Sequence, residues 1–331
     1  MSGMNISTAT REDISGVWNE RWGGEPIVIS GECIRVPEVY GYKISEGRKL
    51  LGLITVRESA HYLEIVSLDS FSENKGIGSA LIEKAAERAL ETDKKRVVLT
   101  TTNDNTKALG FYQRQGFVIS SFKKNGAARS RRLKPSIPLW GDLNIPIRDE
   151  IGLELLLKKG RTGLKKGKVE ILSYDPGWRI SFIQEKIQIA SALGRYCCCI
   201  EHIGSTSVPG MEAKPVIDIL IGAGSSANIG CIVKILEDRG YEHSPGASTR
   251  ERVFLKRTVK DLSLCHLHIV KFGSKEWNKH ILFRNILRRN EEAFAKYLRI
   301  KRSLAENFRV NREKYTEAKS EIIGNILKRG L

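Results

Sequence analysis

The chain has 331 residues, 41% of them hydrophobic, which is enough for two domains that each bury a core. No apolar run approaches the length of a membrane span, and the N-terminus shows no secretory signal, so the sequence predicts a cytoplasmic protein without a membrane partner. Of the six cysteines, three are adjacent at 197–199, where they cannot easily bridge one another. We interpret the cysteines as small buried hydrophobes in a reducing compartment, with a metal or redox role as the alternative.

The net charge of +17 is unevenly distributed along the chain. Residues 1–157 carry 22 Lys and Arg against 20 Asp and Glu, whereas residues 158–168 carry six basic residues and no acid. This Gly- and Lys-rich stretch has no apolar periodicity and repels itself, so it predicts a solvated linker between a domain at 1–157 and a domain at 169–331. A nucleic-acid or membrane-surface patch is the alternative. No aromatic residues interleave with the lysines, as binding of a single strand would need, so nucleic acid is not an expected partner.

Strands and helices alternate along residues 1–157. The predicted order is a hairpin, a strand, a helix, a strand, a helix and two strands, at 41–46 with 49–59, 61–70, 78–92, 96–102, 105–116, 116–122 and 152–157. This alternation is typical of an α/β domain with a mixed sheet.

A glycine-rich turn, SENKGIGSALIEKA (72–85), joins the third strand to the first helix. The first turn of a helix leaves backbone N–H groups without partners and carries a partial positive charge. Gly76 and Gly78 let a diphosphate approach these donors, and Lys75 adds a full charge. On its own the stretch is compatible with a pyrophosphate site and with an ordinary tight turn.

A second motif supports the pyrophosphate interpretation. The run NTKALGFYQRQGF (105–117) resembles the helix motif of the GNAT-type N-acyltransferases, Asn-x-x-Ala-x-x-Phe-Tyr-x-x-x-Gly-Phe, at Asn105, Ala108, Phe111, Tyr112, Gly116 and Phe117. The glycine loop resembles the Arg/Gln-x-x-Gly-x-Gly/Ala loop of that superfamily, except that Glu73 or Asn74 stands where Arg or Gln is usual. The resemblance covers about residues 4–157 and implies an acyl-CoA N-acyltransferase fold with a mixed sheet.

The resemblance implies acetyl-CoA as the cofactor. Its pyrophosphate would bind the loop residues Asn74, Lys75, Gly76, Ile77, Gly78 and Ser79. Its pantetheine arm would pair with the strand residues Ile65, Val66, Ser67 and Leu68. Asn105 would hydrogen-bond the cofactor near its thiol end.

Two residues take catalytic roles by the same resemblance. Tyr112 would protonate the departing thiolate, because a phenol donates a proton yet stays neutral at pH 7; a core aromatic beside Phe111 is the alternative. Glu64 would take the proton of the substrate ammonium, directly or through water; an exposed surface carboxylate is the alternative. The acceptor is an unknown amine, and residues 21–41, with Trp22, Glu25 and Glu32, are expected to shape its pocket together with Trp18.

The second half predicts another α/β unit that ends in helices. The expected elements are a helix, a strand, a strand, a helix, two paired strands and a helical remainder, at 179–194, 196–204, 216–223, 231–241, 251–257 with 263–272, and from 274 on.

Five segments of this half together resemble the GrpB family: YDPGW (174–178), EHIGSTSVPGMEAKPVIDILIG (201–222), CHLHIV (265–270), EWNKHILFRNILR (276–288) and YTEAK (315–319). The family is grouped with the nucleotidyltransferase fold, in which a Gly-Ser pair grips a triphosphate and acids on the next strand bind metal ions. Gly204, Ser205 and Asp218 occupy these places, but Leu220 stands where a second acid is common.

The histidines near Asp218 leave two interpretations open. The spacing of His266 and His268 puts both rings on one face of a strand, and His202 ends the preceding one. Paired with Asp218 or Glu201, the histidines would bind a divalent metal such as zinc or manganese, with Asp218 and His268 as the expected ligands. Otherwise these residues line a polar pocket. Three cations are candidates for holding a phosphate or for the surface: Lys214, Arg284 and Lys319.

The sequence thus predicts an acetyl-CoA-dependent N-acetyltransferase fused to a GrpB domain. One alternative is metal-dependent nucleotidyl transfer to a small molecule by the second domain, with a nucleotide as partner. The other is a fusion that senses ligands without catalysis.

Overall fold

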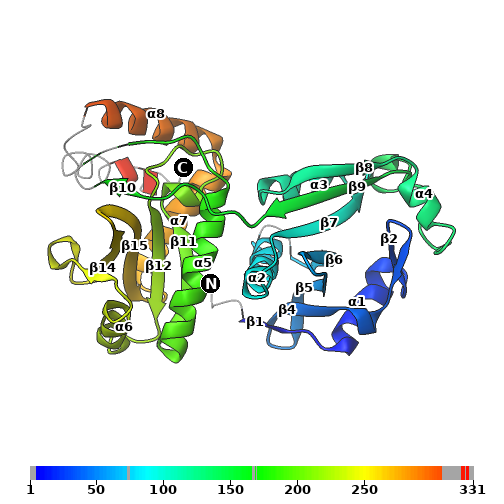
Figure 1. The fold of residues 1–331 in the computed structure, drawn as a ribbon, viewed down its shortest axis with the longest axis horizontal. Helices are drawn as coiled ribbons and strands as arrows, with labels where there is room; N and C mark the ends of the chain where they lie inside the picture. Colours follow the sequence, from blue (N-terminus) through cyan, green and yellow to red (C-terminus); the bar gives the residue numbers. More distant parts are fainter. Residues whose placement is uncertain are drawn as a thin grey trace. The chain divides into compact units, whose positions relative to one another are not determined.

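The computed structural model describes residues 5–72, 75–165, 168, 170–307, 322–324 and 326–327 (Figure 1). They form two compact units, residues 4–157 and residues 158–331. Each unit is built on a mixed sheet with helices packed against it, which confirms the predicted α/β fold class.

The N-terminal unit has a seven-stranded sheet in the order β1-β4-β5-β6-β7-β9-β8. Its strands are β1 Asn5–Thr8, β4 Tyr40–Glu46, β5 Lys49–Glu58, β6 Tyr62–Ser70, β7 Arg96–Thr102, β8 Val118–Lys123 and β9 Glu150–Leu156. Its helices are α1 Arg11–Trp22, α2 Ile77–Glu91, α3 Thr106–Arg114 and α4 Gly126–Ser130. A separate hairpin, β2 Ile27–Ile29 with β3 Glu32–Ile34, lies in the stretch expected to shape the acceptor pocket.

The helix α2 buries the stripe of apolar residues that predicts it. Every member of the stripe has 0% exposure: Leu81, Ile82, Ala85, Ala86 and Ala89. This face packs on β5 and β6, so the periodicity of 3.6 residues sets how the helix lies on the sheet.

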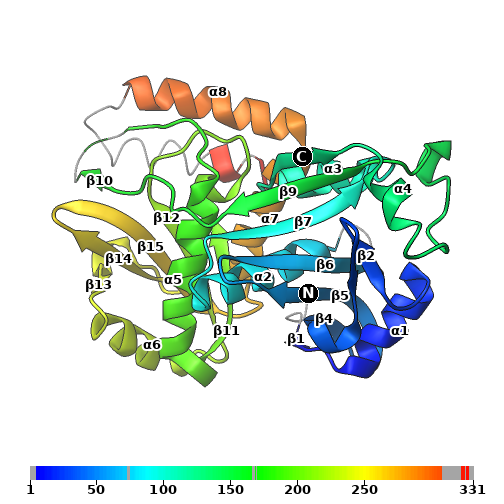
Figure 2. The same cartoon turned by 45° about the vertical axis from the view of Figure 1, so that its right-hand side comes forward.

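The strands β6 and β7 run parallel but stay paired only over four residues, from Tyr62 to Ile65. The other edge of β6 pairs antiparallel with β5, and this pairing contains a β-bulge. Thr55 of β5 lies opposite Ser67 and the next residue of β5 lies opposite Ile65, so Val66 is the extra residue without a partner in β5. An extra residue bends a strand and increases its twist. Figure 2 shows β6 and β7 starting together and separating along their length.

The C-terminal unit has a sheet in the order β11-β12-β15-β14-β13, with β10 added to β15. Its strands are β10 Leu164–Lys165, β11 Cys197–Ile203, β12 Ile217–Ala223, β13 Glu242–His243, β14 Val253–Val259 and β15 Leu262–Lys271. Its helices are α5 Gly177–Leu193, α6 Asn228–Glu237, α7 Lys275–Arg289 and α8 Glu291–Asn307.

The helix α7 packs on one face of this sheet and the helix α5 on the other. Trp277 of α7 packs with Leu220 and Val270 in one core cluster. On the opposite face Phe182 of α5 stacks on His202 of β11. Because neighbouring residues of a strand point to opposite faces, Asp218 and Leu220 belong to the α7 face.

The described part of the basic stretch, residues 158–165 and 168, is not the solvated linker that the sequence predicts. Leu164 is only 3% exposed, and its strand β10 pairs with Ser263 and Leu262 of β15. The Gly163 N–H donates to Pro215 O at 2.7 Å, and Trp178 Nε1 donates to the carbonyl of Arg161 at 2.8 Å. One apolar residue and backbone pairing therefore outweigh the repulsion among the lysines.

The cysteines also differ from the prediction. Cys198 and Cys231 are exposed, and only Cys265 is buried, so the class of small buried hydrophobes fits one residue of the six. All six are free thiols. Among the helices of the described residues, none combines the length and apolarity needed to cross a membrane.

Candidate active site

The N-terminal unit has a free strand edge at the point where β6 leaves β7. The pairing ends at Ile65, yet β6 continues to Ser70. Among the described residues, no strand pairs with the β7-facing edge beyond Ile65. Backbone N–H and C=O groups on such an edge can hydrogen-bond an extended ligand that carries amides. Val66, Ser67 and Leu68 lie in this free segment, whereas Ile65 is the last paired residue.

Two tryptophans of α1 hold this part of β6. Trp18 Nε1 donates to Ser67 Oγ at 3.2 Å, and Trp22 Nε1 donates to Asp69 Oδ2 at 3.1 Å. Four helical residues rise about 6 Å and two strand residues about 6.6 Å, so both contacts fit a helix lying along the strand. Ser67 Oγ also lies 2.8 Å from Thr55 Oγ1. Since Trp18, Ser67 and Thr55 are at most 2% exposed, buried hydrogen bonds fix the bulged strand.

Two glycines shape the turn into α2. Gly76 is the N-cap residue, with a left-handed φ of +77° that favours glycine, and no described side chain caps the helix. Gly78 has a packing role, because a Cβ there would lie 3.0 Å from the Phe111 ring. Lys75 is exposed beside the turn. Ile77 is buried, so only its backbone can face a ligand.

Two other residues predicted to contact the cofactor make hydrogen bonds within the N-terminal unit. Ser79 Oγ accepts a hydrogen bond from Gln115 Nε2 at 2.9 Å. Asn105 Oδ1 caps α3 by accepting from the Ala108 N–H at 3.1 Å, which leaves its amide nitrogen as the group that can face a cofactor. Asn74 lies outside the described residues.

Tyr112 of α3 belongs to an aromatic cluster with Phe111 and Phe117. Its ring centroid lies 5.4 Å from that of Phe111 and 5.6 Å from that of Phe117. The residue is 8% exposed, and none of the described residues hydrogen-bonds its hydroxyl. Burial, with a contribution from the charge of Asp69, raises the pKa of the phenol. Tyr112 therefore stays protonated at neutral pH, which is the state a general acid needs.

Glu64 is buried rather than exposed, so the interpretation as a surface carboxylate is wrong. It is 7% exposed, and Arg57 Nε donates to its Oε2 at 2.5 Å. The same guanidinium forks onto Glu32 at 2.8 and 2.7 Å. Oε1 of Glu64 is therefore the carboxylate oxygen that can face a substrate amine.

Asp69 is a buried carboxylate that sequence reasoning missed. Its side chain is 9% exposed, accepts from Trp22 and lies 4.0 Å from Arg21 Nε. Burial raises the pKa of Asp69, although the Trp22 hydrogen bond and the Arg21 charge oppose this. The sequence does contain a signal for this contact. Two tryptophans stand four residues apart on a predicted helix, and Ser67 and Asp69 stand two residues apart on a predicted strand, so the two spacings match in length.

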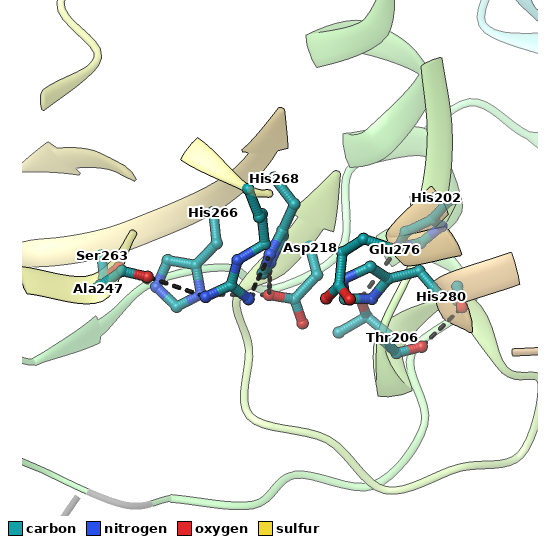
Figure 3. A network of polar contacts seen from close by, with 12 residues as sticks. His202, Thr206, Asp218, Ala247, Ser263, His266, His268, Glu276 and His280 are labelled. Carbon is teal, nitrogen blue, oxygen red and sulfur yellow. Dashed lines mark hydrogen bonds and ion pairs between the residues drawn. The ribbon is translucent and has the colours of Figure 1, made fainter. Parts of the chain in front are cut away.

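In the C-terminal unit, Asp218, His266 and His268 come together on the α7 face (Figure 3). His266 Nδ1 lies 3.2 Å from Asp218 Oδ1, and His268 Nε2 lies 3.7 Å from the same oxygen. Burial alone would raise the pKa of Asp218, but the hydrogen bonds and charges of the two histidines outweigh it and hold the pKa well below its usual range.

Three further residues, not singled out from the sequence, surround His268. Arg252 Nη1 lies 3.3 Å from His268 Nδ1, and the His280 ring lies 5.2 Å from the His268 ring. His280 Nε2 is 3.5 Å from Glu276 Oε1, one turn earlier on α7. Burial lowers the pKa of His268, and burial lowers the pKa of His280 to about 3. The spacing of Glu276 and His280 by four residues was the signal for this pair.

His202 does not join this group. It lies opposite Ile219 in the register of β11 and β12, which puts it on the α5 face. Its ring stacks on Phe182 at 4.7 Å, and its Nε2 lies 3.0 Å from Thr206 Oγ1. Burial lowers the pKa of His202 well below its usual value.

The loop after β11 touches Asp218 through its glycine. Gly204 has a φ of +69°, and a side chain at this position would collide with the Asp218 carboxylate. Ser205 follows in a short 3-10 turn and is 7% exposed.

Of the three predicted cations, Arg284 is paired with groups other than Asp218. Arg284 Nη1 donates to Glu201 Oε2 at 2.6 Å and to His202 O at 2.9 Å, so its charge is paired. Lys214 is half-buried in the loop before β12. Lys319 lies outside the described residues.

The residues present do not fit the metal site considered for Asp218 and His268. Among the described residues, no three His, Cys, Asp or Glu side chains form a group that could hold a metal ion. Leu220, at the position of the second acid, is 0% exposed in the core under α7.

Comparisons with known proteins match each unit to a family. The "Acetyltransferase (GNAT) family" matches residues 7–117, and the family "GrpB protein" matches residues 168–329. The Uncharacterized protein YxbD of Bacillus subtilis is 42% identical over 147 residues, 44% of this chain and 91% of YxbD. The UPF0157 protein YqkA of the same species is 30% identical over 289 residues, 86% of this chain and 74% of YqkA.

The Glutamate-rich protein GrpB of Alkalihalophilus pseudofirmus is 33% identical over 169 residues, 50% of this chain and 97% of that protein. The chain belongs to the GrpB family. Its N-terminal unit carries a GNAT acetyltransferase domain, so both family resemblances are confirmed. The free edge of β6 and Tyr112 lie in the GNAT domain, and the Asp218 group lies in the GrpB domain.

Proposed function

We propose that the GNAT domain is an acetyl-CoA-dependent N-acetyltransferase that acts on an amine of a small molecule or a protein. The observation that supports this most is the parting of β6 from β7 at the Val66 bulge, directly before the turn into α2. A cofactor with a diphosphate and an amide-bearing arm needs an edge of backbone amides and an anion site close together. The strand edge that begins at Val66 and the helix start at Gly76 to Gly78 follow one another along the chain and supply these two features.

Backbone groups would do most of the binding. The edge from Val66 to Ser70 would hydrogen-bond the pantetheine arm, and the N–H groups that open α2 would bind the pyrophosphate with help from Lys75. The side chain of Ile77 is buried, so this residue would contribute through its main chain, whereas Ile65 is buried and still paired with β7. Acetyl-CoA supplies the activated acyl group, and the domain binds it, orients it and moves the protons.

Tyr112 would give its proton to the departing thiolate. Burial keeps the phenol protonated, and none of the described residues competes for its hydroxyl. Glu64 would take a proton from the acceptor amine through Oε1, while Arg57 holds Oε2. The amine attacks the thioester directly in this scheme, so no residue carries the acetyl group.

The test combines binding with turnover. Titration calorimetry of the full chain with acetyl-CoA should show binding, and thiol release should depend on one member of a panel of polyamines, amino acids and peptides. Absence of both binding and release would contradict the proposal.

Replacing Tyr112 with Phe tests the assigned acid. We expect kcat to fall by about 10² or more, with KM for acetyl-CoA nearly unchanged, because only proton transfer is lost. Tyr62→Phe on β6 removes a phenol away from α3 and serves as the matched control. Equal kcat values for the two variants would remove Tyr112 from the mechanism.

A further inference from the structure

The hairpin β2–β3 crosses the place where β6 leaves β7. Arg57 of β5 donates to both carboxylate oxygens of Glu32 on β3, at 2.8 and 2.7 Å. The N–H of Ser30, in the turn of the hairpin, donates to Glu150 Oε1 of β9 at 3.3 Å. In the sheet order, β5 and β9 flank β6 and β7. The hairpin therefore spans both strands on the face that carries Arg57 and Glu150.

The sheet surface from Glu64 to Glu150, here called the covered strip, has a carboxylate at each end. Glu64 of β6 lies beside Val98 of β7. Glu150 of β9 lies opposite Thr102, four residues beyond Val98. Because alternate residues of a strand share a face, Glu64 and Glu150 point to the same side of the sheet. Glu150 lies about 13 Å beyond Glu64 along the strands and roughly 10 Å across them, so a ligand that reaches both acids is extended.

Two buried acids at the Glu150 end of the covered strip each have an oxygen without a partner. Glu150 is 3% exposed, and Asp104, which follows β7, is 6% exposed. Glu150 Oε2 and Asp104 Oδ1 accept no hydrogen bond from the described residues, among which neither side chain has an ion pair. Buried carboxylates are usually hydrogen-bonded or paired with a cation. This end of the strip therefore has the groups to bind a cation.

The Glu64 end also keeps an excess of negative charge. Glu64 and Glu32 share the single guanidinium of Arg57. Opposite charges attract most strongly where water is excluded, so a protonated amine is favoured at both ends of the covered strip. A ligand with one ammonium group would leave the acids at one end without a cation.

The segment between β8 and β9 covers the two unpaired oxygens. Gly141 lies against Asp104, where a side chain would collide with the carboxylate, and a Cβ at Gly126 would lie 2.9 Å from Glu150 Oε2. Three side chains of this segment are mostly exposed, at 60 to 82%: Leu139, Trp140 and Leu143. The part of the segment around Gly141 therefore packs on little, and a ligand can displace it from Asp104.

We propose that the acceptor of the GNAT domain is an extended diamine or polyamine. One amine faces Glu64 and reacts, and a second ammonium group binds Glu150 and Asp104 at the other end of the covered strip. The inference rests on the proposed acetyltransferase function, because it assigns the Glu64 end to the reacting amine. It adds Glu150 and Asp104 as residues that determine specificity.

Turnover of three amines by the full chain with acetyl-CoA tests the need for two charges. We expect kcat/KM for octane-1,8-diamine to exceed that for octylamine by about tenfold or more, because the second ammonium adds charge-assisted hydrogen bonds. Butane-1,4-diamine, which is too short to reach both ends, should behave like octylamine. Equal kcat/KM values for octane-1,8-diamine and octylamine would overturn the inference.

Glu150→Gln and Asp104→Asn test the assigned residues. In each variant the ratio of kcat/KM for octane-1,8-diamine to that for octylamine should fall toward one. Glu154→Gln is the matched control, since Glu154 lies on the same face of β9 and is paired with Arg96 at 2.9 Å. The wild-type ratio in both Glu150→Gln and Asp104→Asn would show that neither acid sets the specificity.

Calorimetry with octane-1,8-diamine in the presence of coenzyme A separates this inference from the proposed function, because no acetyl transfer takes place. Binding that Asp104→Asn or Glu150→Gln weakens about tenfold supports the inference even where no amine is acetylated, a result that contradicts the proposed function alone. Acetylation of octylamine without binding of octane-1,8-diamine would keep the proposed function and overturn the inference.

Discussion

At the scale of single residues, burial decides what each polar group can do. Tyr112 keeps its proton because the phenolate would be buried near Asp69. Asp218 loses its proton although burial opposes this, because two histidines point toward it. Sequence reasoning found both residues, but it could not find Asp69, Arg252 or the ion pair of Glu64, since these depend on contacts between distant segments.

His280 should make the GrpB domain sensitive to acid. Its folded-state pKa of about 3 lies below the ordinary value of 6.5, so the unfolded chain binds the proton first. This contribution to stability is complete above about pH 6.5 and is lost as the pH falls toward 3. Between pH 7.5 and pH 5 the loss from this group is about 2 kcal/mol.

Urea unfolding at pH 7.5 and pH 5 measures the difference in the free energy of unfolding. His280→Asn should make this difference smaller by about 2 kcal/mol. His61→Asn, at an exposed position, is the control and should leave it unchanged. Equal pH dependence in His280→Asn and the wild type would contradict the assigned burial effect.

At the scale of elements, periodicity predicts most of the secondary structure. The apolar stripe of α2 and the β-branched run of β7 depend on local sequence, and both elements lie where they were expected. The strand β10 was missed because a single leucine in a basic stretch carries no periodic signal. The free edge of β6 was not visible either, since a bulge is a property of two paired strands.

Leu164→Ala should destabilise the protein, because the basic stretch is part of the C-terminal fold. A buried leucine that becomes alanine costs about 2–5 kcal/mol, whereas the same change at Leu156, which is 53% exposed, should cost under about 0.5 kcal/mol. Denaturant unfolding of both variants measures the difference. A cost for Leu164→Ala as small as that for Leu156→Ala would restore the interpretation as a linker.

Ser67→Ala should weaken acetyl-CoA binding through the shape of β6. The change leaves Trp18 Nε1 buried without an acceptor, which costs about 1–3 kcal/mol, and it releases the strand beside the bulge. Ser67→Thr keeps the hydroxyl and should recover part of the affinity. Calorimetry against acetyl-CoA measures the affinities, with the exposed Ser120→Ala on β8 as the control. Equal binding by all three variants would contradict this role.

At the scale of the whole molecule, the two domains have separate core clusters. The core cluster around Trp18 draws only on the GNAT domain, and the clusters around Trp277 and Tyr297 draw only on the GrpB domain. The sequence predicts this division because the two sets of motifs do not overlap along the chain.

Hydrogen–deuterium exchange of the full chain, with and without acetyl-CoA, tests the central claim most directly. We predict that added acetyl-CoA slows exchange at the amides of Val66–Ser70 and at the first turn of α2, while the exposed edge strand β8 is unaffected. Unchanged exchange in these two segments at saturating acetyl-CoA, or slowing confined to the GrpB domain, would contradict the proposed acetyltransferase site.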